Sequence, residues 1–213
     1  MEFAELIEVV GDEPVFETGL LLAGNVSPGD VQRQLSRWHA AGRLHQLRRG
    51  VYALAPPFQK IKPHPFTVAN HLAHGSYVSC QSALAYHSLI PEYTPVTTSV
   101  TTGRAGQWET PLGNYTYRRI QIKLLQGYYL IEVGGGQSAF VATPEKALLD
   151  LVYLQPGGDA PDYLQELRLQ NLDRLNLDQL DQLAARIGSP KLRRAAAHVR
   201  NLARAEAMEY EGM

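Results

Sequence analysis

The chain has 213 residues, of which 45% are hydrophobic and 19% charged, and its formal net charge is -1. These values exclude a disordered chain, because the apolar content is large enough to bury one large core or two small ones. The sequence has no basic start of a secretory signal and no apolar run near the roughly 20 residues that cross a bilayer, so we expect a cytoplasmic protein without a membrane-spanning segment.

Three helices are expected at the start of the chain. Apolar residues recur at helical spacing within residues 2–10 and again within residues 16–23, before Gly24-Asn25. A third helix is predicted from Pro28, because Ser27 suits the N-cap position and Asp30 places a negative charge in the first turn.

The third helix is predicted to have one apolar face and one polar, basic face. Val31, Leu35 and Trp38 share the face that we expect to be buried. The opposite face carries Arg33, Ser36, Arg37 and Ala40, with Gln32 at its flank. Gly42 is expected to end the helix with a positive φ angle.

A tight hairpin is predicted after this helix. Two short strands, residues 44–47 and 51–54, are joined by Arg48-Arg49-Gly50, which is expected to place two guanidinium groups at an exposed tip. Between Val31 and Gly50 the sequence has five arginines and no acidic residue.

A basic helix followed by a basic hairpin is typical of a winged helix-turn-helix domain. Arginine suits bidentate contacts with guanine edges and with phosphates. The predicted DNA contacts are Gln32, Arg33, Ser36 and Arg37 on the helix and Arg48 and Arg49 on the wing. The alternative is an ordinary amphipathic helix and hairpin with a solvated, charged surface.

A domain boundary is expected near residue 57, which divides the chain into residues 1–57 and 58–213. Prolines at positions 56, 57, 63 and 65 interrupt regular structure there. The second part is predicted to be a mixed α+β domain with a helical tail. Helices are expected at 65–74 and 81–87, and strands at 77–80, 96–102, 115–125 (one strand or a bent pair), 128–133 and 139–142.

A buried helix is predicted after Thr143, which suits its N-cap. Its body is apolar on nearly every side, so it is expected to be the central helix of the second domain. Lys146 and Asp150 are the only charges inside this apolar body, and we interpret them as a structural ion pair, or as separate partners of the sheet. Short leucine-rich helices follow from Asp162, and a last, basic helix begins at Pro190.

Other polar clusters are weaker candidates for sites. A second basic surface could comprise Arg118, Arg119 and Lys123 on a strand together with Arg186, Lys191, Arg193, Arg194, Arg200 and Arg204 in the tail, either as a nucleic-acid groove or toxin-directed surface or as a solvated helix face. His71, His74, Cys80 and His87 match no zinc pattern, so no metal is expected. No cofactor is expected, and no catalytic motif is present, so the chain is not expected to be an enzyme.

Three blocks of sequence, in this order, carry a resemblance to a known family. They are Leu47-Arg48-Arg49-Gly50-Val51-Tyr52-Ala53-Leu54, the stretch from Tyr77 to Pro91 (YVSCQSALAYHSLIP), and Thr143-Pro144-Glu145-Lys146-Ala147-Leu148-Leu149-Asp150. The chain resembles the AbiE-type antitoxins of type IV toxin-antitoxin systems over residues 15–155. It departs from them at Ser88, where glycine is expected, and after Pro156, where no match is found.

The resemblance implies a non-enzymatic protein with two functions. Its winged helix would bind inverted repeats in its own promoter and repress the operon, and its C-terminal domain would oppose a nucleotidyltransferase-like toxin without requiring a stable complex. Two rival hypotheses remain. One is a winged-helix regulator whose second domain senses a small ligand, and the other is an enzyme in which residues 64–213 act on nucleic acid.

Overall fold

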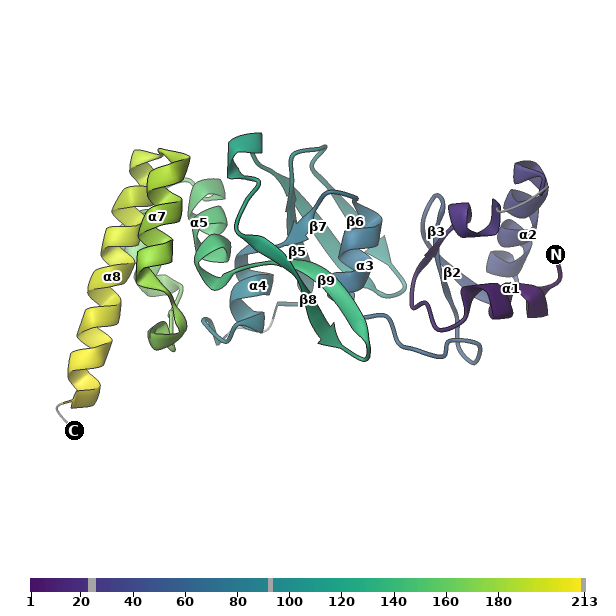
Figure 1. Cartoon of the computed structure of the whole chain (residues 1–213), viewed down its shortest axis with the longest axis horizontal. Helices are drawn as coiled ribbons and strands as arrows, with labels where there is room; N and C mark the ends of the chain where they lie inside the picture. The colour runs from purple at the N-terminus through teal and green to yellow at the C-terminus, as the bar shows by residue number, and fades with distance from the viewer. Residues whose placement is uncertain (23–25, 92–93, 212–213) are drawn as a thin grey trace.

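The computed structural model describes residues 1–22, 26–91 and 94–211 and has a mixed α+β fold. The N-terminal helices lie at one end of the long axis and the C-terminal helices α7 and α8 at the other, with the central sheet between them (Figure 1). A small sheet with its helices is followed by a six-stranded sheet, and a group of helices closes the far end.

The N-terminal unit, residues 3–54, packs helices on a three-stranded antiparallel sheet with strand order β1-β3-β2. Its elements are α1 (Phe3–Val10), β1 (Phe16–Glu17), the 3₁₀ helix η1 (Thr18–Leu22), α2 (Pro28–Ala40), β2 (Leu44–Arg48) and β3 (Val51–Leu54). The prediction of one helix over 16–23 is wrong, because Phe16 and Glu17 pair with Tyr52 and Val51 of β3 before the 3₁₀ turn begins. Residue 23 and the expected end at Gly24-Asn25 lie outside the described residues.

The predicted third helix is confirmed as α2. Pro28 occupies its first turn, and the carbonyl of Ser27, rather than its side chain, accepts bonds from the backbone N–H of Asp30 and Val31. Val31 and Leu35 are fully buried in the N-terminal unit, and Gly42 has a φ of 69° just beyond the helix. The apolar spacing therefore identifies the buried face of α2 correctly.

The central sheet has the strand order β6-β7-β5-β4-β9-β8, in which β7-β5 and β4-β9 are parallel pairs and the others antiparallel. The strand β6 was not predicted from the sequence, because Trp108 is its only large apolar side chain and it lies at an edge of the sheet. The predicted strand 115–125 divides into β7 and a 3₁₀ turn. The elements are α3 (Pro65–Leu72), β4 (Tyr77–Val78), α4 (Cys80–Tyr86), β5 (Val96–Thr101), β6 (Gly106–Thr110), β7 (Gly113–Arg119), η2 (Ile122–Leu124), β8 (Tyr128–Gly134) and β9 (Gln137–Ala142).

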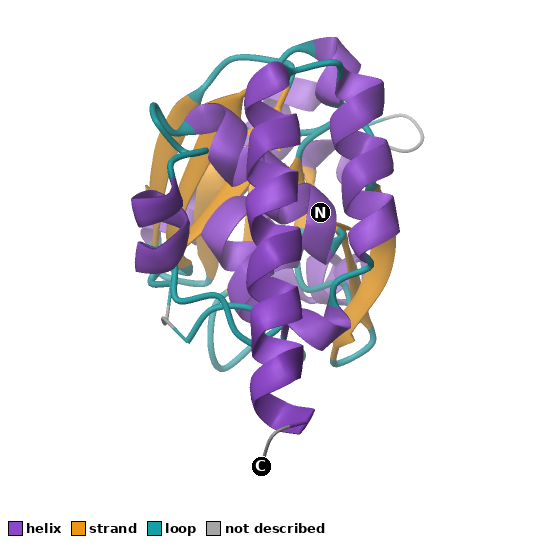
Figure 2. Ribbon diagram, turned by 90° about the vertical axis from the view of Figure 1, so that its left-hand side faces the viewer, coloured by secondary structure: helices purple, strands orange, loops and turns teal. Residues whose placement is uncertain are grey.

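Five further elements form the C-terminal end of the molecule, where α8 lies in front in the end-on view of Figure 2. They are α5 (Pro144–Leu154), α6 (Pro161–Glu166), η3 (Leu172–Arg174), α7 (Leu177–Ile187) and α8 (Pro190–Glu211). In α5, the side chain of Thr143 accepts a bond from the backbone N–H of Lys146 and residues 145–152 are all buried, which confirms the expected buried helix. No described helix is long and apolar enough to cross a membrane.

The apolar core does not stop at the expected boundary near residue 57. A small core lies within the N-terminal unit, around Leu6, Leu35 and Tyr52. The large core runs from α3 and the central sheet to α8, and it also includes Val15, Leu47, Val51 and Ala53 of the N-terminal unit. One side of the small sheet is therefore buried against the central part of the chain.

A fully buried ion pair stands at the centre of the large core. Lys146 and Asp150, one turn apart on α5, form an ion pair, and neither side chain is exposed to solvent. Asp150 Oδ2 also accepts hydrogen bonds from Tyr77 Oη, at 2.9 Å, and from Ser79 Oγ, at 2.7 Å. Burial raises the pKa of Asp150, whereas the Lys146 ammonium and the two hydroxyls oppose that rise. Both predicted arrangements, an ion pair and a bond to the sheet, are thus present for Asp150.

We expect Lys146→Met to lower the free energy of unfolding by about 3–5 kcal/mol, because it leaves the Asp150 carboxylate buried without its cation. The double variant Lys146→Met with Asp150→Asn should recover part of this loss, because an amide oxygen can still accept the Tyr77 and Ser79 hydroxyls. Urea unfolding followed by circular dichroism measures both values. A double variant less stable than the single one would contradict this account.

Ser88, the position where the resemblance expects glycine, has a backbone conformation that glycine favours. Its φ is 61°, just after the end of α4, and its carbonyl accepts a bond from Asn171 Nδ2 at 2.7 Å. A residue with a Cβ atom pays about 1–2 kcal/mol in this left-handed region. The turn at Ser88 therefore has a conformation suited to glycine, and the serine strains it.

Replacing Ser88 by glycine should stabilise the protein by about 1 kcal/mol, because the left-handed conformation then carries no Cβ penalty. Differential scanning calorimetry should show a rise of about 2–4 °C in Tm. Ser88→Ala is the matched control, since it keeps the Cβ atom, and should show no such rise. A Tm that falls in Ser88→Gly would show that the serine side chain stabilises the turn.

Candidate nucleic-acid interface

The outward face of α2 gathers the four helix residues predicted to contact DNA. Gln32, Arg33, Ser36 and Arg37 are all exposed, whereas Val31 and Leu35 on the opposite side are buried. We call these four residues the α2 face. The exposed acidic residues Glu5 and Glu8 lie on α1, whereas α2 carries one acidic residue, Asp30.

The side chains of the α2 face make local contacts that leave the face accessible to a ligand. Arg33 forms an ion pair with Asp30, but their side chains are 76% and 57% exposed. An ion pair this exposed contributes little to stability, so the guanidinium can exchange Asp30 for a phosphate at small cost. Ser36 Oγ donates to the Gln32 carbonyl at 2.9 Å, which holds the hydroxyl against the helix.

The two arginines of the hairpin turn have different environments. Arg49 is exposed at the tip. Arg48 is half-buried, its Nη2 donates to the His71 carbonyl at 3.4 Å, and its Nε is buried with no hydrogen-bond partner among the described residues. The prediction that both guanidinium groups lie at an exposed tip is wrong for Arg48. A register shift between Gln46 and Arg48 in β2 accompanies this placement.

The other basic residues between Val31 and Gly50, which are Arg43, His39 and His45, lie against other groups of the N-terminal unit. The Arg43 guanidinium lies 4.9 Å from the centre of the Phe3 ring, and Phe3 also packs against Trp38. His39 Nδ1 lies 3.0 Å from the Leu44 carbonyl oxygen. Burial, and then the nearby His39, lowers the pKa of His45, so this side chain adds little positive charge near pH 7.

The second basic set is mostly engaged in contacts between elements. Arg194 pairs with Asp159, and Arg200 pairs with Asp178 and Asp181 and so joins α8 to α7. Lys191 donates to the backbone carbonyls of Tyr153 and Gln155 at the end of α5. Arg118 donates to the Leu154 carbonyl beside them. Cations are favoured at this end of a helix by the helix dipole. Arg186 Nη1 donates to Gln126 Oε1 at 3.3 Å. Arg119, Lys123, Arg193 and Arg204 are exposed, whereas the other five residues are engaged as described, so the described structure does not join the nine residues into one free basic surface.

The histidines and the cysteine that could ligate a metal do not converge. His71 and His74 both lie beside Glu17, Cys80 is buried, and His87 Nε2 lies 2.9 Å from the Ala142 carbonyl oxygen. Burial raises the pKa of the Cys80 thiol. Among the described residues, no three His, Cys, Asp or Glu side chains form a group suited to a metal ion. The contact of Glu17 with the two histidines carries no signal in the sequence, because 54 residues separate Glu17 from His71.

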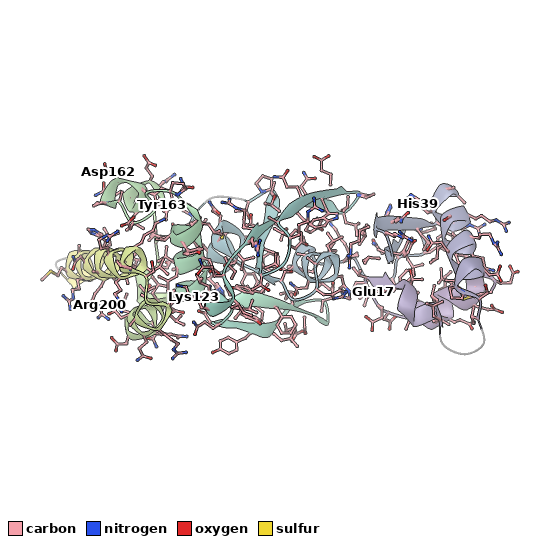
Figure 3. The ribbon with its side chains drawn as sticks, turned by 90° about the horizontal axis from the view of Figure 1, so that it is seen from above. Glu17, His39, Lys123, Asp162, Tyr163 and Arg200 are labelled. Carbon is pink, nitrogen blue, oxygen red and sulfur yellow. The ribbon has the colours of Figure 1, made fainter. Side chains whose placement is uncertain are left out.

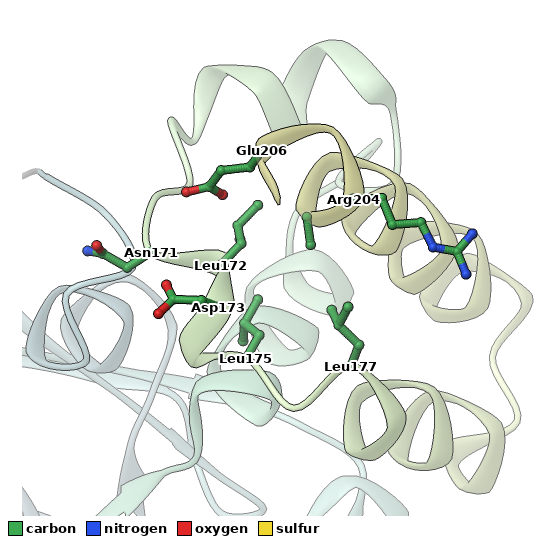
Figure 4. A pocket seen from close by; sticks show the side chains of 8 residues that line it. Asn171, Leu172, Asp173, Leu175, Leu177, Arg204 and Glu206 are labelled. Carbon is green, nitrogen blue, oxygen red and sulfur yellow. The ribbon is translucent and has the colours of Figure 1, made fainter. Parts of the chain in front are cut away.

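A groove lies at the far end of the molecule, between η3 and the last turns of α8 (Figure 4). Its volume is about 690 Å³, which is in the range of small-molecule sites. Leu172, Leu175 and Leu177 form its apolar wall, and Arg204 and Glu206 lie on α8 beside it. No pattern in the sequence predicts this groove.

No protein-family model matches this chain. No curated protein sequence matches it.

Proposed function

We propose that this protein is a DNA-binding antitoxin of a type IV toxin-antitoxin system. In this proposal residues 3–54 form a winged helix that binds inverted repeats in the protein's own promoter and represses the operon. The remainder of the chain opposes a nucleotidyltransferase-like toxin in the cytoplasm, and the protein is not an enzyme. The observation that carries the proposal is the exposed, basic α2 face, whose helix buries its apolar side in the N-terminal unit.

The α2 face supports the DNA-binding part. The major groove of DNA is wide enough to admit an α-helix, and a helix with an exposed polar side can present that side to the base edges. Gln32, Arg33, Ser36 and Arg37 supply hydrogen-bond donors for base edges and phosphates, and α2 follows η1 in the order of a helix-turn-helix. The three-stranded sheet behind α2 holds this helix at the end of the molecule (Figure 1).

The contacts between two of the sequence blocks support the family assignment. Tyr77 and Ser79 of the second block donate to Asp150 of the third block inside the core. Glu145, also in the third block, is buried and accepts a bond from the backbone N–H of Asn176 at 2.8 Å. The second and third of the three blocks that resemble the antitoxins thus meet in one buried contact.

A second candidate function is a winged-helix regulator that senses a small ligand. The groove between η3 and α8 favours it, because its leucine wall and its nearby polar groups have the character of a ligand site. A nucleotidyltransferase-like reading frame beside the gene would favour the antitoxin over this regulator.

The DNA-binding part is tested by fluorescence anisotropy with the upstream DNA of the gene, at two salt concentrations and with random DNA as competitor. We expect salt-sensitive, specific binding by the wild type. The double variant Arg33→Ala with Arg37→Ala should lose specific binding, because each base contact contributes roughly 1–3 kcal/mol, while its thermal stability stays within experimental error.

The matched control is Arg168→Ala with Arg174→Ala, which also removes two exposed cations but from the opposite end of the chain. Its affinity should equal that of the wild type. Equal loss in both double variants would reduce the effect to net charge, and unchanged affinity in Arg33→Ala with Arg37→Ala would assign DNA binding to another surface.

The antitoxin part is tested by co-expression with a nucleotidyltransferase-like reading frame adjacent to the gene. We expect the toxin alone to arrest growth and the full chain to restore it. Arg33→Ala with Arg37→Ala should restore growth as well, because the α2 face serves only the promoter. Growth arrest that persists with the wild-type chain would reject the antitoxin role and favour the ligand-sensing regulator.

A further inference from the structure

The N-terminal unit meets the end of α3 through a small set of polar contacts. Glu17 Oε1 lies 3.5 Å from His71 Nδ1 and 2.9 Å from His74 Nε2. Arg48 Nη2 donates to the His71 carbonyl at 3.4 Å. Figure 3 places Glu17 at the junction between the N-terminal unit and the central part of the molecule. We call Glu17, Arg48, His71 and His74 the α3 clamp.

Apolar contact lies beside the α3 clamp. Leu47 and Val51 flank the hairpin turn that carries Arg48, and both belong to the same buried core as Val68 and Leu72 of α3. The polar contacts of the clamp therefore border a closed apolar contact rather than an open, solvated gap. Fixing Arg48 in this place costs side-chain entropy, which only a favourable contact can offset.

The environment of Arg48 is that of a helix cap. The last carbonyls of a helix have no partner within the helix, and cations are favoured there by the helix dipole. In α3, the Ala69 carbonyl accepts a hydrogen bond from Tyr117 Oη of β7 at 2.6 Å. The His71 carbonyl accepts one from Arg48 Nη2. The positive charge of Arg48 also opposes the rise in the pKa of Tyr117 that burial causes, which places the guanidinium near β7 as well.

We infer that Arg48 is a positioning residue that caps α3 and, with Glu17, fixes the N-terminal unit on the central part of the chain. Of the two arginines in the hairpin turn, Arg49 alone then contacts DNA. The DNA part of this inference rests on the proposed function, whereas the clamp itself does not. The clamp sets the direction of the α2 face relative to the rest of the molecule.

The first test measures hydrogen exchange of the full chain without DNA, by mass spectrometry of peptides that cover residues 66–76. We expect Arg48→Ala and Glu17→Ala to increase exchange at the end of α3 at least tenfold, because both remove contacts that hold it. Arg49→Ala is the matched control and should leave exchange unchanged. Arg48→Lys keeps a cationic donor for the His71 carbonyl and should restore most of the protection.

The second test measures how the affinity for the upstream DNA depends on salt. Loss of one phosphate contact lowers the slope of log K against log salt by about 0.9. Arg49→Ala should show this decrease. Arg48→Ala should keep the wild-type slope, even where its affinity is weaker because the α2 face is less well oriented.

Two results would overturn the inference. A decrease in slope in Arg48→Ala that equals the decrease in Arg49→Ala would make Arg48 a phosphate contact. Unchanged exchange at the end of α3 in Arg48→Ala would reject the clamp. Absence of specific DNA binding in the wild type would reject the proposed function alone, since the exchange measurement still decides whether the clamp exists.

Discussion

The buried pair of Lys146 and Asp150 is the constraint on which the rest of the large core depends. A charged pair without solvent is tolerated only when all its partners are in place, so α5, β4 and the turn before α4 must meet in one arrangement. Gly127 is part of the same arrangement, because a Cβ atom there would lie 3.1 Å from the Lys146 Cβ atom. Tyr128 follows it and stacks on Tyr77, with ring centres 4.2 Å apart. The pair thus specifies how the sheet and its central helix fit together.

The sequence predicts those elements whose signals are local. The helix α2 and the hairpin of β2 and β3 follow from caps, spacing and a turn, so their positions agree with the structure to within about a residue. The strand β1 and the strand β6 could not be predicted, because Phe16 pairs with Tyr52 and Gly106 pairs with Tyr117, and neither pairing leaves a periodic pattern. The same holds for the site. The exposure of Arg33 and Arg37 follows from helical spacing, but the burial of Arg48 depends on His71, which is 23 residues away.

The two basic sets show why a count of charges does not identify a binding surface. In the tail, Arg194 forms an ion pair with Asp159, and Arg200 forms ion pairs with Asp178 and Asp181. These pairs join neighbouring elements of the C-terminal end. The α2 face differs because its helix has an apolar side that packs inward, and because its ion pair, between Arg33 and Asp30, is largely exposed to solvent and is exchanged at small cost. Its positive charge therefore remains available to a ligand, which is the basis of the proposed repressor.

The continuity of the large core across residue 57 affects how this protein can be divided for study. A cut in the proline-rich linker would separate Val15, Leu47, Val51 and Ala53 from the core that buries them and would remove Arg48 from the end of α3. Each fragment would present a new apolar surface to water, which favours aggregation. Fragments cut at this linker would therefore report on exposed core as much as on DNA binding or toxin neutralisation. Point substitutions in the intact chain test the two proposed activities separately, without exposing the core.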